Sequence, residues 1–460
     1  MGSGELLEDL RAAVGASHAV TDREVMAQHE TDWTGVYRGR ARAVVRPSST
    51  AEVAALMTAC ARWAAPVVVQ GGNTGLVGGS VPDDSGRAVV VSTRRLARVG
   101  DVDSTAGQVT VDGGATLASV RSHVLAAGFD VPVDLAARAT ATLGGMTATN
   151  AGGTRVLRHG TMRRNVLGVE AVLADGTVIS HLAGLEKDNT GYDLGGLLCG
   201  SEGTLGVITR VRLRLVPDLP HRVTALIAVS DLDAAVTVLS RLRGGVDGLE
   251  AAEYVVRRGV DLVIERFGAT DPFARAHPVY LMVEAAARRD PTDELSDALA
   301  GAGLLDVAVS SSPARREALW QLRELHTDAL GAVGPPRKYD VTVPVRRLPD
   351  FVAAATAVVE AREQPLVLHH FGHLGDGNVH LNVLGTTALT AEQLHDLDAA
   401  VLGQVASVGG SIGAEHGIGR LKRPWLSLSR SPAELAAFRA LKVALDPAGL
   451  LNPGVLLPDP

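Results

Sequence analysis

The sequence predicts an α+β fold in two domains, and three observations support this prediction. The chain has 460 residues, of which 46% are hydrophobic and 21% charged, enough to bury more than one core. Before Pro217, short strand patterns alternate with helix patterns and glycine-rich loops. After Pro220, strands are separated by longer helices. We therefore expect a first domain over 1–219, a second over 220–415 and a closing segment over 416–460.

The first domain shows a clear order of elements. Apolar, β-branched runs predict strands and an apolar stripe at helical spacing predicts helices. Asp175-Gly176 between two apolar runs predicts a hairpin turn, and Gly128 predicts a helix end. The expected strands are 41–47, 66–70, 87–93, 108–114 and 204–217, the hairpin is 165–180, and the helices are 50–65 and 116–128.

The second domain predicts an antiparallel sheet covered by helices, because its strands do not follow the short strand–helix–strand rhythm of a parallel sheet. The region 245–275 shows no clear pattern. The expected strands are 222–229, 279–286, 306–311, 339–345, 366–372 and 378–384, and the expected helices are 231–243, 291–302, 313–333, 346–363, 391–407 and 432–445.

Composition narrows the class of protein. Lys and Arg number 44 against 51 Asp and Glu, a net charge of −7 that does not favour nucleic acid binding. Only two cysteines occur, Cys60 and Cys199, which excludes a disulfide scaffold and fits a reducing compartment. The first residues are acidic, unlike a signal peptide, and no long apolar stretch occurs. We expect a cytoplasmic protein.

Three glycine-rich stretches predict a site for a long, flat ligand. Residues 71–79, GGNTGLVGG, directly follow a strand and can turn successive backbone N–H groups inward around a pyrophosphate. Their spacing fits neither the Rossmann nor the P-loop pattern. Residues 142–153 and 200–206 are similarly rich in small residues. A dinucleotide accounts for all three, whereas each loop alone is equally explained as a tight surface turn.

Histidines are concentrated near the C-terminus. His373 and His380 flank a glycine turn that can bring both imidazoles together, and Glu415-His416 follows about one helix later. Two histidines and one carboxylate form a divalent-metal arrangement with positions open for substrate, although a buried histidine is often only structural. His369 and His370, consecutive on a strand, are interpreted as structural.

A G-x-S-x-G pattern at Ser411 matches the nucleophile elbow of serine hydrolases. That elbow joins a strand to a helix, but here a helix precedes it and a second glycine loop follows. The pattern therefore argues only weakly for a hydrolase.

Arg323 and Thr327 are four apart on the predicted helix 313–333, and Lys338 begins the next strand. Together they offer a guanidinium, a hydroxyl and an ammonium group to a carboxylate. The alternative is that Arg323 pairs with a neighbour such as Glu317 or Glu324. Lys338 is more informative, because the chain has only four lysines.

Several motifs in order resemble the FAD-linked D-2-hydroxyacid dehydrogenases of the vanillyl-alcohol oxidase / p-cresol methylhydroxylase superfamily. Within that family the chain most resembles the D-2-hydroxyglutarate branch. The matching runs are QGGNTGLVGGSVP (70–82), TATNAGGTRVLRHG (147–160), NVLGVEAVLADGT (165–177), KDNTGYDL (187–194), GSEGTLGVIT (200–209), GHLGDGNVHLN (372–382), AEHGIG (414–419) and LDPAGLLNPG (445–454).

The resemblance implies a two-subdomain FAD-binding domain of the p-cresol methylhydroxylase type, a substrate domain, and a C-terminal segment that returns to the FAD domain. It implies FAD, held non-covalently because residues 71–80 contain no histidine. The implied FAD-binding residues are Gly71, Gly72, Asn73, Thr74, Gly75, Gly78, Gly79, Ser80, Thr142, Gly144, Gly145, Thr149, Asn150, Gly152, Gly153, Ser201, Glu202, Gly203, Gly206, Val207, Ile208 and Asn452.

The resemblance also implies the reaction site. His373, His380 and Glu415 would bind a divalent metal, with zinc favoured over manganese or iron. His416 would be the general base and a substrate contact, together with Arg323, Thr327, Lys338 and Asn382. The expected reaction oxidises D-2-hydroxyglutarate to the 2-oxo acid by hydride transfer to flavin N5.

Alternatives remain at this stage. They are a D-lactate or broad 2-hydroxyacid dehydrogenase, a non-redox relative such as an ether-lipid synthase, and the serine hydrolase. The electron acceptor is open between an electron-transfer flavoprotein and a quinone route, and a homodimer is compatible with the sequence.

Overall fold

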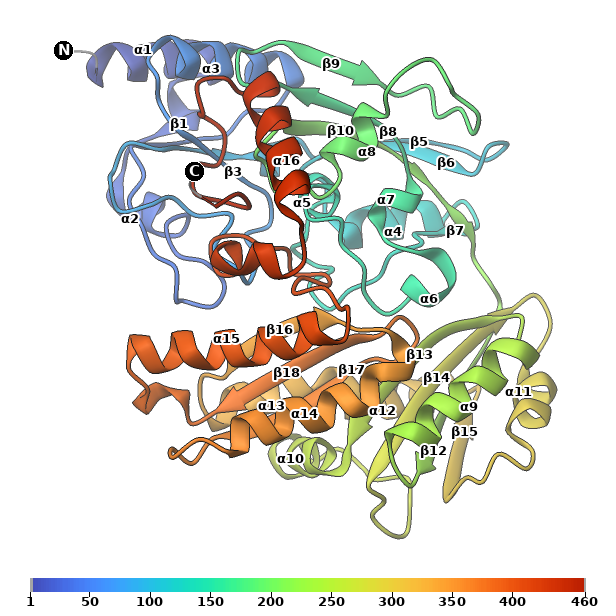
Figure 1. The fold of residues 1–460 in the computed structure, drawn as a ribbon. Helices are drawn as coiled ribbons and strands as arrows, with labels where there is room; N and C mark the ends of the chain where they lie inside the picture. Colours follow the sequence, from blue (N-terminus) through green and yellow to red (C-terminus); the bar gives the residue numbers. More distant parts are fainter. Residues whose placement is uncertain (1–2, 459–460) are drawn as a thin grey trace. The chain divides into compact units, whose positions relative to one another are not determined.

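The computed structural model describes residues 3–458, which form two compact units (Figure 1). Unit 1 comprises, of these residues, 3–152, 160–218 and 415–458. Unit 2 comprises Gly153–His159 and Leu219–Ala414. The chain thus enters unit 2 twice, first as a short excursion of seven residues and then as a continuous domain.

Unit 1 contains a small, mostly parallel sheet next to a larger antiparallel one. In the small sheet β4 pairs in parallel with β2 and β3, while β1 pairs antiparallel with β2. Helix α3 covers it because Val53, Leu56 and Met57 recur on one face and are buried against the strands. The strands are, in order across the sheet, β1 (Ala19–Val20), β2 (Ala43–Val45), β4 (Val89–Ser92) and β3 (Val67–Gln70).

The larger sheet of unit 1 has five antiparallel strands. The predicted hairpin 165–180 is confirmed as β8 and β9, joined through Asp175 and Gly176, whose φ of 91° requires glycine. The predicted strand 204–217 is shorter than expected, because residues 204–206 stay in a loop. In order, the strands are β5 (Val99–Asp103), β6 (Gln108–Asp112), β10 (Val207–Arg214), β8 (Val166–Val172) and β9 (Val178–His181); β7 (Phe129–Asp130) pairs separately with β11 (Val216–Pro217).

Short helices connect these strands, most of them started by a side-chain cap. Ser49 caps α3 and Thr116 caps α4, each accepting a backbone N–H bond at the helix start. The helices of unit 1 are α1 (Ser3–Val14), α2 (Arg23–Ala27), α3 (Thr50–Arg62), α4 (Leu117–Leu125), α5 (Leu143–Ala148), α7 (Met162–Asn165), α8 (Leu194–Leu198) and α16 (Pro432–Leu445).

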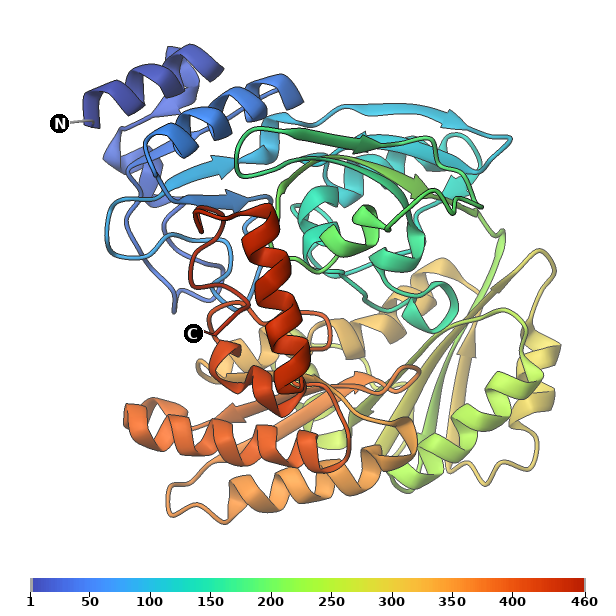
Figure 2. The same cartoon turned by 45° about the horizontal axis from the view of Figure 1, so that its top comes forward.

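The C-terminal segment is built into unit 1, as Figure 2 shows for α16 and the tail that follows it. Leu451 bridges to Val67 of β3 in parallel, so the tail extends the small sheet. The half-buried Lys442 ammonium group donates to the carbonyls of Thr204 and Leu451 and pairs with Asp446. Lys442, one of the four lysines, therefore has a structural role in holding the C-terminal segment to unit 1.

Unit 2 is one sheet of seven strands, all antiparallel as predicted. β12 is buried without interruption from Val223 to Val229, because helices pack on both of its faces. In order, the strands are β15 (Asp306–Ser310), β12 (His221–Val229), β14 (Val279–Ala287), β13 (Leu249–Val256), β17 (Val367–His373), β18 (Asn378–Leu384) and β16 (Arg337–Thr342).

The middle strand of this sheet, β13, was not predicted. It lies in the stretch 245–275 that showed no clear pattern, because Glu250 and Glu253 interrupt an otherwise apolar run. The helix that follows it, α10, was also not predicted. The helices of unit 2 are α6 (Val156–His159), α9 (Leu232–Gly245), α10 (Arg257–Phe267), α11 (Thr292–Leu299), α12 (Pro313–Glu324), α13 (His326–Val333), α14 (Leu348–Glu360) and α15 (Ala391–Ser407).

The expected single helix 313–333 is wrong in one respect, because it divides at Leu325 into α12 and α13. The division places the His326 ring against Phe371 of β17, with ring centroids 5.0 Å apart. Arg323 lies in the last turn of α12 and Thr327 belongs to α13, so the two residues do not share one continuous helix face.

Candidate active site

The strand register of unit 2 brings polar side chains from four strands to one face of the sheet. Cross-strand partners point to the same face, and so do residues two apart on a strand. Buried carboxylates, histidines and amides therefore form adjacent rows on the face that α10, α12 and α13 cover. The rows are Lys338–Asn382–His369, Asp340–His380–Phe371 and Thr342–Asn378–His373–Glu253.

His373 and His380 converge, as the sequence predicted from the glycine turn between them. Their Nε2 atoms are 3.3 Å apart. Each Nδ1 faces a buried carboxylate: Glu253 Oε1 lies 2.6 Å from His373 and Asp340 Oδ1 lies 3.4 Å from His380. A neutral imidazole that donates from Nδ1 keeps a lone pair on Nε2, so the two lone pairs face each other.

That pair of nitrogens fits a divalent metal. Tetrahedral zinc holds two imidazole nitrogens at about 2.0–2.1 Å, which puts them about 3.4 Å apart. Carboxylates on the far nitrogen are the usual outer partners of histidine ligands, since they fix the tautomer and orient the ring. The donors suit zinc, manganese or iron.

Glu253 is fully buried on β13 and has two different partners. Its Oε1 accepts from His373, and its Oε2 accepts from Arg323 Nε at 2.8 Å. Burial alone would raise the pKa of this carboxyl, but His373 and Arg323 outweigh it and hold the pKa below its ordinary value. The sequence analysis missed this residue.

Arg323 is buried and does not pair with Glu317 or Glu324, the partners considered from sequence. It bonds Glu253 and lies over the Phe371 ring, with Cζ 4.6 Å from the ring centroid. Both contacts hold the guanidinium against the sheet. Thr327 is half-buried on α13, and Lys338 is half-buried on β16 beside Asn382. Burial lowers the pKa of Lys338, partly offset by Asp328.

His369 and His370 lie on opposite faces of β17. His370 packs beside Tyr254, and burial lowers its pKa to about 4. His369 shares a row with Asn382 and Lys338, and burial lowers its pKa to about 4 as well. Their interpretation as structural residues stays a prediction.

Unit 1 carries the glycine loop, and its backbone is arranged to receive an anion. Among residues 71–79, no backbone N–H donates to another backbone group of the described chain. Asn73 and Gly78 have φ values of 55° and 70°, which turn the backbone back on itself. Tyr37 packs so tightly under Gly78 that a Cβ there would lie 2.5 Å from its ring. The loop fits a pyrophosphate.

The other two glycine-rich segments adjoin this loop within unit 1. A Cβ on Gly71 would meet the Thr142 hydroxyl at 2.3 Å, so only glycine permits that approach. Asn452 donates from Nδ2 to the carbonyls of Gly79 and Glu202, at 3.0 and 2.6 Å. The buried Ser201 hydroxyl has no hydrogen-bond partner in the described chain. Such an unsatisfied group fits a ligand that supplies the partner.

The remaining sequence-predicted FAD residues divide into two sets. Val207 and Ile208 start β10 and point into the cores of unit 1, so they reach a ligand only through their backbone. The others lie in the three glycine-rich segments, which include α5: Gly72, Thr74, Gly75, Ser80, Gly144, Gly145, Thr149, Asn150, Gly152, Gly153, Gly203 and Gly206.

Glu202 holds the turn that carries His416. Its two carboxylate oxygens accept from the backbone N–H groups of Ile418 and Gly419, at 2.8 and 2.7 Å. Burial raises the pKa of this carboxyl, although both N–H groups and Lys422 oppose the rise. His416 Nε2 lies 4.0 Å from Glu415 Oε1 in the same turn. Glu415 and His416 belong to unit 1, whereas His373 and His380 belong to unit 2.

Ser411 lacks the setting of a hydrolase nucleophile. Its hydroxyl donates to the carbonyl of Gly413 in its own turn, at 3.0 Å, and its backbone pairs with Thr342. No helix of the described chain begins directly after it. The pattern is a structural turn.

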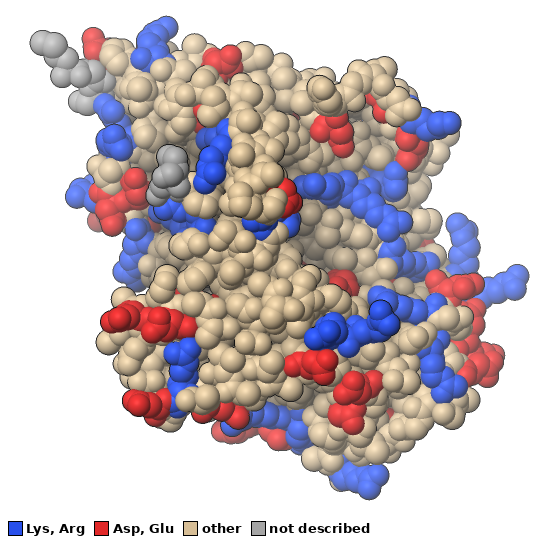
Figure 3. All heavy atoms as spheres, viewed as in Figure 1, with Lys and Arg blue, Asp and Glu red and all other residues tan. Residues whose placement is uncertain are grey.

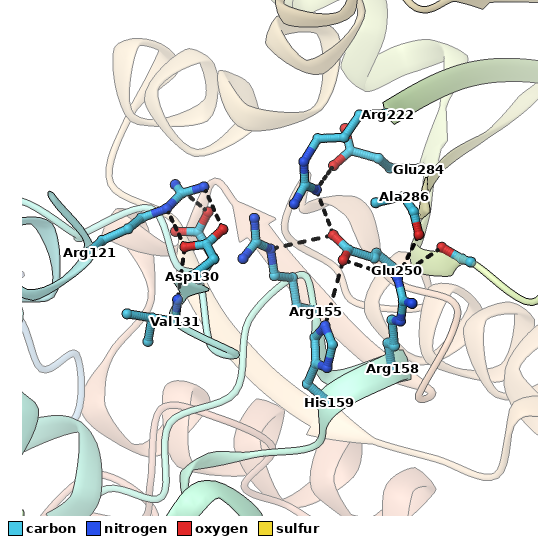
Figure 4. Close-up of polar contacts among 12 residues, drawn as sticks. Arg121, Asp130, Val131, Arg155, Arg158, His159, Arg222, Glu250, Glu284 and Ala286 are labelled. Carbon is cyan, nitrogen blue, oxygen red and sulfur yellow. Dashed lines mark hydrogen bonds and ion pairs between the residues drawn. The ribbon is translucent and has the colours of Figure 1, made fainter. Parts of the chain in front are cut away.

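Arginines fasten the short excursion 153–159 to the sheet of unit 2. Glu250 of β13 lies among Arg155, Arg158, His159 and Arg222 (Figure 4). The same figure shows a separate pair in unit 1, Arg121 with Asp130. Glu250 is buried like Glu253, but its partners are structural.

Acidic and basic side chains both occur on each unit in the face shown in Figure 3. Within residues 3–458, the helices are too short or too polar to cross a bilayer.

Comparison with known proteins identifies the class. Residues 219–456 match the C-terminal domain of FAD linked oxidases, and residues 41–181 match an FAD binding domain. The chain belongs to the FAD linked oxidases and is an FAD-linked oxidoreductase acting on a hydroxyl group.

Similar curated proteins show which family within the FAD linked oxidases the chain belongs to. The chain is 38% identical to the mitochondrial D-2-hydroxyglutarate dehydrogenase of Bos taurus over 98% of this chain and 84% of that protein. It is 36% identical to the D-2-hydroxyglutarate dehydrogenase of Xanthomonas citri pv. viticola over 97% and 96%. A putative mitochondrial D-lactate dehydrogenase of Schizosaccharomyces pombe is 32% identical over 94% and 85%. The chain is a member of the FAD-linked D-2-hydroxyacid dehydrogenase family, as the motifs implied.

Solved structures agree on the fold. p-Cresol methylhydroxylase superposes with a TM-score of 0.76 at 16% identity, over 99% of this chain and 96% of that one. Alkyldihydroxyacetonephosphate synthase gives 0.76 at 15% identity, over 98% and 85%. The predicted fold class is confirmed.

Proposed function

We propose that this protein oxidises D-2-hydroxyglutarate to the corresponding 2-oxo acid, using FAD and a divalent metal. The observation that carries the proposal is the facing Nε2 pair of His373 and His380, on the same sheet face as the buried Arg323. Similarity to D-2-hydroxyglutarate dehydrogenases over nearly the whole chain supports the choice of substrate. D-lactate is the second candidate, supported by the more distant relative.

FAD, when bound, supplies flavin N5 as the acceptor for the hydride that leaves the substrate Cα. Unit 1 would bind it without a covalent link, with the N–H groups of residues 71–79 on the pyrophosphate. Asn452 would fix the loop through its bonds to Gly79 and Glu202. The backbone thus provides the binding energy and leaves the redox chemistry to the cofactor.

A divalent ion supplies Lewis acidity that lowers the pKa of a hydroxyl group bound to it. His373 and His380 would hold it through Nε2, and Glu415 would add a carboxylate. Connectivity supports this third ligand: Ser411 is paired to Thr342, in the same strand row as His373. Glu415 follows Ser411 by four positions, a chain length of at most about 14 Å.

His416 would act as the general base. An imidazole nitrogen of His416 accepts the proton from the substrate hydroxyl oxygen while the Cα–H bond breaks, so that the C–O bond becomes a carbonyl. The turn that carries His416 is fixed by Glu202, which bonds two of its N–H groups. A fixed turn limits the positions open to the base and so reduces the entropy lost on reaching the transition state.

Arg323 and Lys338 would select the second carboxylate of the substrate. Arg323 keeps guanidinium nitrogens beyond the Nε that bonds Glu253, and a guanidinium presents donors in a fork that suits a carboxylate. Lys338 adds a point charge, with Asn382 as its cross-strand neighbour and a neutral donor. Lactate has no distal carboxylate and would gain nothing from these groups.

An anaerobic absorbance titration tests the function. Protein loaded with FAD and zinc or manganese should lose its flavin absorbance within seconds of adding D-2-hydroxyglutarate, and more slowly with D-lactate. Faster bleaching by D-lactate would replace the substrate by the second candidate. Flavin that neither acid bleaches would contradict the proposed reaction.

Lys338→Ala tests the choice of substrate separately. We expect kcat/KM for D-2-hydroxyglutarate to fall about 10- to 100-fold, because a charged hydrogen bond contributes about 1.5–3 kcal/mol. The value for D-lactate should stay within about twofold. An unchanged ratio of the two values would show that Lys338 does not read the distal carboxylate.

A further inference from the structure

Glu253 links two groups that the proposed function assigns to different parts of the substrate. One of its oxygens accepts from His373 Nδ1 at 2.6 Å and the other from Arg323 Nε at 2.8 Å. Its side chain is 1% exposed, so water does not compete for either oxygen. Glu253 therefore contacts both a sequence-predicted metal ligand, His373, and a sequence-predicted substrate residue, Arg323.

We propose that Glu253 is a positioning residue that sets the metal-binding tautomer of His373 and the position of Arg323 together. This inference rests on the proposed function. By accepting from Nδ1, Glu253 leaves the Nε2 lone pair of His373 directed toward His380. By accepting from Nε, it holds the Arg323 guanidinium and leaves the other nitrogens of that group for a substrate carboxylate.

Asp340 is the carboxylate beside the second histidine of the pair. It faces His380 Nδ1 at 3.4 Å, on the opposite side of the histidine pair. It accepts a hydrogen bond from Asn378 Nδ2 at 2.8 Å, which ties it to the neighbouring strand. Glu253 therefore links the histidine pair to the guanidinium of Arg323.

The chemistry of the site requires a carboxylate at this position. A glutamine has the same shape but only one acceptor oxygen. If its amide nitrogen faced His373, the ring would have to accept at Nδ1 and carry its proton on Nε2, where metal binds. If its amide nitrogen faced Arg323, two donors would meet. Glu253→Gln must therefore disturb one of the two groups while preserving volume.

Glu284 offers a matched control from the neighbouring strand. It also fastens α12 to the sheet, accepting from Trp320 Nε1 at 3.0 Å and Arg316 Nη1 at 3.3 Å. Its other hydrogen bonds come from Arg222 and Thr224. Glu284→Gln therefore perturbs the same helix and leaves the histidine pair alone.

The experiment measures Zn²⁺ affinity of the metal-free, FAD-loaded full chain by chelator competition, for the wild type, Glu253→Gln and Glu284→Gln. We expect Glu253→Gln to weaken Zn²⁺ binding about 10- to 100-fold, the usual effect of removing an outer partner of a histidine ligand. It should also raise KM for D-2-hydroxyglutarate. Glu284→Gln should leave the zinc affinity within about twofold while lowering thermal stability.

Three other outcomes overturn the inference. Equal zinc affinity in the wild type and Glu253→Gln would refute the role of Glu253 and leave the proposed function standing. An equal loss in Glu284→Gln would show that general loosening of α12, not the tautomer of His373, weakens the metal. Absence of zinc binding in the wild type would refute both the inference and the metal-assisted reaction.

Discussion

Glu250 and Glu253 are two buried carboxylates three residues apart on the same strand, and they serve different purposes. Glu250 is 2% exposed and Glu253 0%. A bulge in the pairing of β13 with β14, between Leu249 and Ala251, makes Glu250 the extra residue and turns it toward the arginines of Figure 4. Glu253 keeps the regular register and faces His373.

The comparison shows that burial and a lowered pKa do not identify a functional carboxylate. Burial opposes ionisation of Glu250, but His159 and Arg222 outweigh it and hold the pKa at about 2. The pKa of Glu253 is also lowered. What separates them is the partner. Glu250 lies among three arginines and His159, whereas the histidine that contacts Glu253, His373, has its Nε2 atom 3.3 Å from Nε2 of His380, where a metal can bind.

Removing one of the two facing histidines should have the largest effect on activity. For His380→Ala we expect kcat/KM for D-2-hydroxyglutarate to fall by at least about a thousandfold, or about 4 kcal/mol, because the Lewis acid loses a ligand. Steady-state kinetics at saturating metal measures this. His395→Ala, on an exposed position of α15, is the control and should keep full activity. A loss below tenfold for His380→Ala would contradict the metal assignment.

Removing the carboxylate of Glu250 should lower the stability of the protein and leave metal binding unchanged. Glu250→Ala leaves Arg155 and Arg222 without their shared partner, and breaking a buried ion pair costs about 3–5 kcal/mol of unfolding free energy. Urea unfolding of unit 2 measures this change. Zinc affinity of the folded variant should match the wild type. If zinc affinity fell while stability held, the roles of the two glutamates would be the reverse of those assigned here.

Low pH should lower the free energy of unfolding through His326, a buried residue of α13 close to Arg323. Burial, with a contribution from Arg323, lowers its pKa to about 3 from 6.5. The unfolded chain therefore binds a proton that the folded chain does not, and the unfolding free energy falls as pH drops through 6.5. At pH 5 the loss is about 2 kcal/mol.

Comparing the wild type with His326→Phe isolates the contribution of His326 to the pH dependence of stability. His326→Phe keeps a ring against Phe371 but cannot titrate, so its unfolding free energy should change less between pH 7 and pH 5 than that of the wild type, by about the same 2 kcal/mol. Equal pH dependence in the two proteins would rule out His326 as the source.

Local pattern predicted most of the elements but not the sheet that they form. Helices 391–407 and 432–445 were expected at the residues where α15 and α16 lie, because their caps and apolar periods are local signals. The order of seven strands depends on pairings between distant segments. β13 was missed because its two glutamates mimic the polar positions of a loop.

The candidate site shows the same limit: a contact between residues close in the sequence could be predicted, and a contact between distant residues could not. His373 and His380 are seven residues apart, so a glycine turn sufficed to predict that they meet. Glu253 lies 120 residues from His373 and 70 from Arg323, so no local rule connects them. One signal was available: a charged residue inside an apolar run that can alternate as a strand requires a buried partner. The sequence does not say which partner.

The contacts of Asn452 indicate that the glycine loop after β3 is completed only late in synthesis. Asn452 accepts from the backbone N–H of Val69, 383 residues earlier in the chain, and donates to Gly79 in the adjoining loop. Until the ribosome has released the last part of α16 and the tail, the loop after β3 lacks these bonds. We therefore expect nascent chains ending before this asparagine to retain little flavin, so that cofactor loading follows translation.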